Sequence, residues 1–101
     1  MVIISKATIR EFTTLHAESN NALENWYEIT AGSNWKNFHE MKNTFNSVDS
    51  VGNDRYVFNI KGNDYRLVAL IIFKKRTLFI LFIGTHKEYD GINASTVVFK
   101  K

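Results

Sequence analysis

Neither cysteine nor proline occurs in this sequence. Without cysteine the chain can form no disulfide bond, no catalytic thiolate and no thiolate metal site. No apolar run approaches the roughly 20 residues that span a bilayer. The first residues, MVIISKATIRE, lack the layout of a signal peptide, because their apolar part is short and charges follow at once. We therefore expect a cytoplasmic protein that does not associate with a membrane.

Motifs for metals and for nucleotide phosphates are also missing. The histidines are scattered, and no pair of carboxylates has the spacing of metal ligands. No glycine-rich phosphate-binding loop is present. We therefore expect no metal and no other cofactor. The histidines are His16, His39 and His86.

Charge is divided unevenly along the 101 residues, of which 45% are hydrophobic. Residues 1–54 carry four basic and seven acidic side chains, a net charge of −3. Residues 55–101 carry nine basic and three acidic side chains, a net charge of +6. A basic half favours a polyanionic partner such as nucleic acid, although ordinary solubilising charge gives the same pattern. The length predicts a single domain over residues 1–101 with one core.

Helical spacing of apolar residues dominates the first half of the chain. Stripes of aliphatic and aromatic side chains recur every three to four residues, as expected for helices that face a core. Ser5 and Asn34 are suited to the N-caps of the first and third helices, and Gly32 to a left-handed C-cap of the second. The expected elements are an edge strand at 2–4, helices at 6–16 and from about 21 to 30, a shorter third helix after Asn34, and a loop at 46–54.

The stretch from Tyr56 to Asp90 reads as three strands joined by tight turns. Its residues are mostly β-branched or aromatic, and Gly62-Asn63 suits a hairpin turn. The strands at 65–73 and 78–83 are apolar on both faces, which is typical of central strands that are covered by other elements on both faces. Helices would cover one face, and the C-terminal segment or a partner protein the other. The predicted fold class is α+β, a small antiparallel-rich sheet packed against two to three N-terminal helices, with residues 91–101 ending as a short strand or a frayed helix.

Polar side chains collect where this sheet begins and ends. In an antiparallel meander, the turn at Gly62 and the exit at Gly84 lie at the same sheet end. Arg66 alternates with its apolar neighbours, so it projects from the face that Asn59 and Lys61 share. We call this sheet end the rim; its residues are Lys61, Asn63, Arg66, His86, Tyr89 and Asp90.

The rim suits RNA scission by attack of a 2′-hydroxyl on the adjacent phosphate. This reaction needs a base, an acid for the leaving oxygen and cations for the phosphate charge. His86 fits either proton-transfer role, Tyr89 fits a proton donor or a base-stacking ring, and Asp90 could orient His86. The catalytic candidates are Lys61, Arg66, His86, Tyr89 and Asp90, and the RNA-binding candidates are Asn59, Asn63, Lys74, Lys75, Arg76 and Lys87.

Structural roles are the alternative for the same residues. A single histidine at a strand end is commonly a surface residue, and Arg66 with Asp90 would make an ordinary ion pair. Tyr89 would then be a packing residue with a hydrated hydroxyl. Lys74, Lys75 and Arg76 lie in a turn that the meander places at the opposite sheet end, where they would act by general attraction of RNA or as solvated charges.

Two runs, VFNIKGNDYRLVALIIF and FIGTHKEYD, closely resemble the HigB-type toxins of bacterial type II toxin–antitoxin systems, a branch of the RelE-like mRNA interferases. The segments IISKATIREF and NALENWYEITAGSNWKNFHEMKNTF are similar to the helical half of that family. The resemblance implies a RelE-like fold and a ribosome-dependent, metal-independent endoribonuclease that cuts translated mRNA at the ribosomal A site. It also implies a cognate HigA-like antitoxin with a helix-turn-helix domain, and contact with operator DNA only through that antitoxin.

Two other functions remain compatible with these residues. One is a non-catalytic RNA- or ribosome-binding module on the same fold. The other is an interaction or structural domain in which the polar sheet end has no role.

Overall fold

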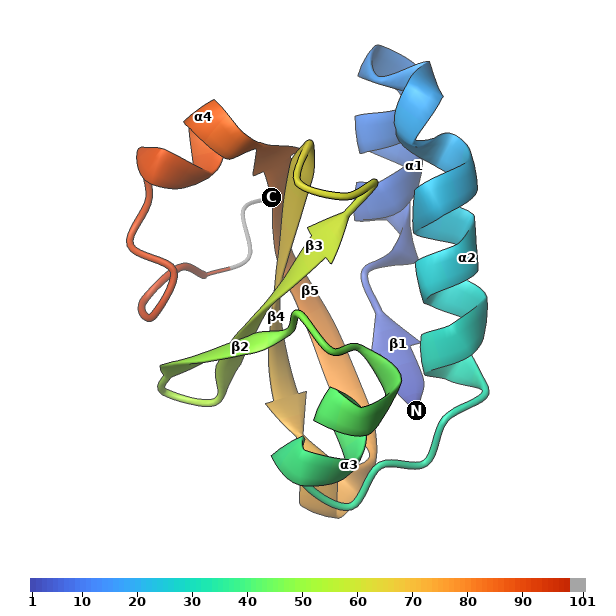
Figure 1. Cartoon of the computed structure of the whole chain (residues 1–101), viewed down its shortest axis with the longest axis vertical. Coiled ribbons are helices and arrows are strands. Elements are labelled where there is room, and N and C mark those ends of the chain that lie inside the picture. Colours follow the sequence, from blue (N-terminus) through green and yellow to red (C-terminus); the bar gives the residue numbers. More distant parts are fainter. Residues whose placement is uncertain (99–101) are drawn as a thin grey trace.

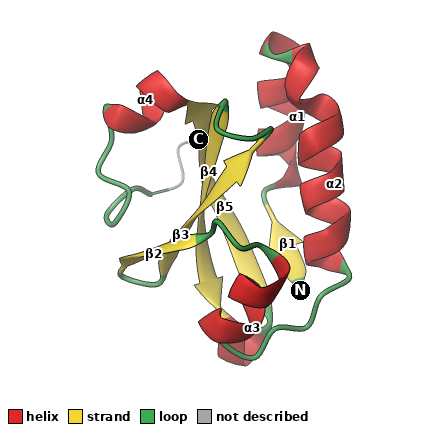
Figure 2. Cartoon of the chain, viewed as in Figure 1, coloured by secondary structure: helices red, strands yellow, loops and turns green. Residues whose placement is uncertain are grey.

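The computed structural model describes residues 1–98. It consists of one sheet with helices on both faces (Figures 1 and 2). The elements in chain order are β1 (Val2–Ile4), α1 (Lys6–Leu15), the single-turn helix η1 (Ala17–Ser19), α2 (Asn20–Ala31), α3 (Phe38–Thr44), β2 (Asp49–Gly52), β3 (Arg55–Ile60), β4 (Tyr65–Ile72), the single-turn helix η2 (Phe73–Lys75), β5 (Thr77–Thr85) and α4 (His86–Asp90).

The sheet has the strand order β1-β5-β4-β3-β2. Within residues 1–98, β1 is parallel to its neighbour, β5, and the other three strand pairs are antiparallel. This arrangement confirms the predicted α+β class, the antiparallel meander and the edge position of β1. No helix within residues 1–98 is long and apolar enough to cross a bilayer.

The main core lies between the sheet and the helices α1, α2 and α3 (Figure 1). Leu23 and Trp26 of α2 are 0% and 2% exposed. The ring of Trp26 packs edge to face on that of Phe58 in β3, with ring centroids 5.3 Å apart. Burying each such side chain contributes about 1.5–3 kcal/mol. The helical stripes predicted from the sequence therefore face the core, except at Leu15, the last residue of the first stripe, which is 82% exposed.

The second face of the sheet is covered in part by the C-terminal segment. Val57 and Val68 form a small cluster there with Ala94, on the side where Figure 1 shows α4. Asn53 and Arg55 hold this segment by donating to the carbonyls of residues 95 and 97. Farther along the face, an apolar cavity of about 460 Å³ is lined by Ile4, Ser5, Arg55, Leu70, Phe79, Leu81 and Val98.

The helix caps differ from the sequence prediction. Ser5 precedes α1, but its φ of 78° is left-handed and its side chain makes no capping hydrogen bond. Gly32 follows α2 with φ −81°, so it is not left-handed. The third helix is capped by Asn37 instead of Asn34, and Trp35 lies before it, held by a 3.0 Å bond from its Nε1 to Thr44 Oγ1.

Two segments also differ from the prediction. The loop expected at 46–54 contains β2, which pairs with β3 through an irregular register. Residues 91–98 form turns and irregular backbone instead of a strand or helix, and residues 99–101 lie outside the described part.

Candidate active site

The backbone register brings the two halves of the rim together. Arg66 of β4 pairs with Asn59 of β3 on one side and with Gly84 of β5 on the other. At the neighbouring position, Tyr65 pairs with Thr85, the last residue of β5 and the N-cap of α4. The expected convergence of the Gly62 turn and the Gly84 exit is therefore confirmed, and Arg66 shares its face with Asn59.

A β-bulge in β5 sets the face of Gly84. Val68 pairs with Phe82 and Ala69 pairs with Ile80, so Leu81 is the extra residue. Ile80 belongs to the main core, whereas Phe82 packs on the second face. An inserted residue reverses the alternation of the strand beyond it. Gly84 consequently lies on the second face, beside Arg66.

Glycine at position 84 permits a close approach of side chains. A Cβ atom there would lie 2.4 Å from Cζ of Phe82 and 3.1 Å from Cβ of Glu88. The ring of Phe82 therefore occupies the space next to the backbone at the sheet exit. Cβ of Glu88 is close as well, so the glycine lets α4 approach the end of β5.

The short helix α4 carries three of the catalytic candidates. Thr85 and Glu88 form a capping box, in which the Glu88 amide donates to Thr85 Oγ1 at 3.1 Å and the Thr85 amide donates to Glu88 Oε1 at 2.8 Å. His86 and Asp90 are one turn apart, with Nδ1 and Oδ2 separated by 3.4 Å. Both side chains are more than half exposed, at 56% and 64%. Tyr89 packs against the second-face cluster.

Arg66 is half-buried and bound to backbone carbonyls. Its Nη1 donates to the carbonyl oxygen of Asn63 at 3.1 Å and to that of Tyr65 at 3.3 Å. Within residues 1–98, the ion pairs do not include Arg66. The structure therefore does not contain the Arg66–Asp90 ion pair considered as a structural alternative, since Asp90 lies beside His86.

Lys61 occupies the hairpin tip at the same sheet end. Its φ of 53° is left-handed, and its Nζ lies 3.5 Å from Oδ2 of Asp64. Its charge also acts on Glu18, on the helical side. The ion pair of Lys61 is therefore within its own hairpin, and its charge favours the ionised form of Glu18.

The remaining RNA-binding candidates are divided between the two ends of the sheet. Asn63 and Lys87 are exposed at the rim. Lys74 and Lys75 are exposed at the opposite end, as the meander predicted. Arg76 is used structurally, because its Nε donates to Asn34 Oδ1 at 2.9 Å and its Nη1 donates to the Phe73 carbonyl.

One cluster beside the rim was missed by sequence reasoning. The hydroxyl of Tyr65 donates to Oε1 of Glu18, and Nδ1 of His16 lies 3.8 Å from the same carboxylate oxygen. The Tyr65 hydrogen bond, followed by a backbone hydrogen bond, lowers the pKa of Glu18. It also raises the pKa of Tyr65 to about 12, with burial adding to the shift. No local pattern signals this pair, since 47 positions separate the partners.

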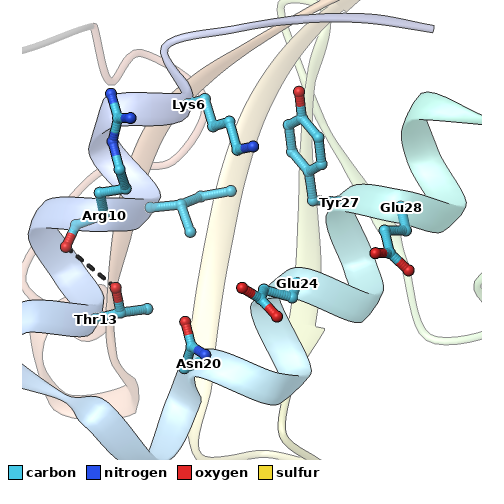
Figure 3. A pocket seen from close by; sticks show the side chains of 8 residues that line it. Lys6, Arg10, Thr13, Asn20, Glu24, Tyr27 and Glu28 are labelled. Atoms are coloured by element: carbon cyan, nitrogen blue, oxygen red, sulfur yellow. Dashed lines mark hydrogen bonds between the residues drawn. The ribbon is translucent and has the colours of Figure 1, made fainter.

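A separate charged groove lies between α1 and α2 (Figure 3). Lys6 and Arg10 come from α1, and Glu24 and Glu28 come from α2. Lys6 Nζ lies 4.4 Å from the ring centroid of Tyr27. This groove is on the helical side of the sheet, away from α4 (Figure 1), so it does not belong to the rim.

The sequence is similar to those of known proteins along nearly its whole length. The family model described as HigB_toxin, RelE-like toxic component of a toxin-antitoxin system, matches residues 19–92. The mRNA interferase HigB of Escherichia coli O6:H1 is 32% identical over 94 residues, which cover 91% of each chain. The mRNA interferase toxin HigB of Escherichia coli K12 and the mRNA interferase HigB of Shigella flexneri are each 28% identical over 96 residues, 93% of this chain and 92% of theirs.

A match of this extent, covering both the helical half and the rim, identifies the family. A toxic component of such a system has a cognate antitoxin as its partner. The chain belongs to the HigB toxin family, the RelE-like toxic components of toxin–antitoxin systems.

Proposed function

We propose that this chain is an mRNA interferase, an endoribonuclease that cuts translated mRNA, and that the rim is its active site. The curated relatives are named as mRNA interferases. The observation that carries the site assignment is the register of the sheet end. It sets Arg66 beside Gly84, two residues before His86.

Arg66 is suited to the phosphate. A guanidinium group presents several donors in a plane and binds phosphate oxygens through paired hydrogen bonds. Among the described residues, the guanidinium makes hydrogen bonds through Nη1 alone, which leaves the donors on Nη2 and Nε for the scissile phosphate. The charge of Arg66 would then stabilise the extra negative charge of the transition state.

His86 is suited to proton transfer. Asp90 Oδ2 lies 3.4 Å from Nδ1, which favours a proton on Nδ1 and leaves Nε2 for the substrate. In the reaction, the 2′-oxygen bonds to phosphorus while the bond to the 5′-oxygen breaks. The 2′-hydroxyl proton goes to a base, and an acid protonates the leaving 5′-oxygen. His86 takes one of these roles, and Tyr89 supplies a second proton or a stacking surface.

The proposed substrate is mRNA that is held on a ribosome. His86 and Asp90 are more than half exposed, so RNA held on a ribosome can reach them directly. The basic second half, with its net charge of +6, suits contact with ribosomal RNA in the cytoplasm. The partner that silences the toxin would be a HigA-like antitoxin with a helix-turn-helix domain, and operator DNA would be reached through that antitoxin alone.

Growth arrest on induction tests the site assignment. Arg66→Ala, His86→Ala and Tyr89→Phe should each relieve arrest while the circular dichroism spectrum stays that of the wild type. Lys36→Ala, at an exposed position before α3 and outside the candidate residues, is the control and should stay toxic. Full toxicity of all three rim variants would overturn the assignment.

The competing functions give different results in the same cells. A non-catalytic ribosome-binding module would arrest translation without producing new mRNA ends. A structural domain would produce no arrest, even from the wild-type chain.

A further inference from the structure

Tyr65 connects the helical half of the molecule to the rim. It is the first residue of β4, and it is only 6% exposed. Its ring lies edge-on to Phe12, with centroids 5.3 Å apart, and to His16, with centroids 5.6 Å apart. Its hydroxyl donates to Glu18 in η1. The side chain is therefore fixed from three directions by α1, its C-cap residue and η1.

The backbone of Tyr65 supports the rim on both sides. It pairs with Ile60 of β3 and with Thr85 of β5. Its carbonyl oxygen accepts a hydrogen bond from Arg66 Nη1 at 3.3 Å. Thr85 is in turn the N-cap of α4, which carries His86. Two of the proposed catalytic side chains thus depend on where this one residue lies.

Tyr65 stands at the end of the sheet. The Ile60–Tyr65 and Tyr65–Thr85 pairs are the last of their ladders. The turn before Tyr65 is exposed, with positive φ values of 53° at Lys61 and 65° at Gly62. Terminal pairs next to exposed turns open more readily than central ones. A side-chain anchor at the terminal residue opposes that opening.

We propose that Glu18 and Tyr65 are positioning residues for the cleavage reaction. Their hydrogen bond holds the first residue of β4 in place, and through it the Arg66 guanidinium and the start of α4. This inference rests on the proposed mRNA interferase function. Neither residue contacts the RNA in this role.

The ionisation states of the pair agree with this role. The hydrogen bond lowers the pKa of Glu18 and raises that of Tyr65 to about 12. At neutral pH the carboxylate is charged and the phenol keeps its proton, so donor and acceptor are both present. His16 and Lys61 are the other charged or titratable groups acting on Glu18, and both favour its ionised form.

The test is cleavage kinetics on a defined mRNA bound to ribosomes. Tyr65→Phe keeps the ring and removes the donor, while Glu18→Ala removes the acceptor. Misplaced catalytic groups lower the rate of the chemical step, so kcat should fall roughly tenfold in each variant while KM changes less. Glu18→Gln retains an acceptor oxygen and should recover part of that loss. The double variant Glu18→Ala, Tyr65→Phe should be no slower than the slower single variant.

Tyr56→Phe is the matched control, since Tyr56 is a buried tyrosine of β3 on the same face of the sheet, 9% exposed. It should keep the wild-type kcat. The inference is overturned if Tyr65→Phe keeps the wild-type kcat, or if its activity falls only in proportion to the unfolded fraction measured in the same buffer. If the wild-type chain produces no cleavage, the proposed function fails and the inference fails with it. Cleavage by the wild type together with full activity of Tyr65→Phe rejects the inference alone.

Discussion

At the scale of single residues, the His86–Asp90 pair is the most specific feature of the rim. The two side chains are one helical turn apart, with Nδ1 and Oδ2 at 3.4 Å. A carboxylate at this position selects the imidazole tautomer and limits its rotation. Asp64 offers a useful contrast, because it is equally exposed and lies 3.5 Å from Lys61, but on the hairpin. In the proposed mechanism, the carboxylate that orients the proton-transfer group is therefore Asp90.

Asp90→Asn should slow cleavage more than Asp64→Asn. Loss of the orienting carboxylate should lower kcat roughly tenfold, whereas loss of the imidazole in His86→Ala should lower it about a hundredfold or more. Single-turnover cleavage of ribosome-bound mRNA measures both. Equal rates for Asp90→Asn and the wild type would remove Asp90 from the mechanism.

At the scale of elements, α4 is five residues long and depends on its cap. The sequence predicted the strands around it well, because the segments now β3, β4 and β5 alternate or are apolar on both faces. It missed β2, since NSVDSVGND contains few apolar residues and pairs only through β3. The N-cap at Asn34 was wrong because Asn37, three residues later, accepts the Glu40 amide.

Thr85→Ala should loosen α4 without unfolding the protein. Loss of an N-cap hydroxyl costs about 1 kcal/mol of helix stability, and a helix this short has little else to replace it. We expect faster amide hydrogen exchange in residues 86–90, reduced cleavage and a melting temperature lowered by about 4 °C at most. Thr85→Ser keeps the hydroxyl and should behave as the wild type. Unchanged exchange in Thr85→Ala would mean that the capping box does not hold the helix.

At the scale of the whole molecule, the site depends on contacts between distant parts of the chain. The convergence of the Gly62 turn and the Gly84 exit was predictable, because a meander requires it. The bulge at Leu81 and the Glu18–Tyr65 bond were not, since each depends on packing between segments that no local pattern relates. Candidate residues could therefore be named from the sequence, but not the contacts that hold them.

The Glu18–Tyr65 hydrogen bond should make the free energy of unfolding depend on pH in two ranges, one acidic and one alkaline. The pKa of Glu18 is lowered from 4.5, so its contribution is present above that value and is lost as the pH falls through the folded pKa. The pKa of Tyr65 is raised from 10.0 to about 12, so its contribution is present below 10.0 and is lost as the pH rises toward 12. In urea unfolding, the wild type should be more stable than Tyr65→Phe between pH 4.5 and pH 10.0, and it should lose that advantage at lower and at higher pH. A pH-independent difference would contradict this assignment.

The most direct measurement of the central claim is a map of RNA ends on ribosome-bound mRNA. Wild-type protein should generate internal cuts with 5′-hydroxyl ends and matching 2′,3′-cyclic phosphates, as attack by the 2′-hydroxyl requires. The folded double variant Arg66→Ala, His86→Ala should generate none. Cuts by the double variant at the same positions and the same rate as the wild type would show that the rim is not the active site.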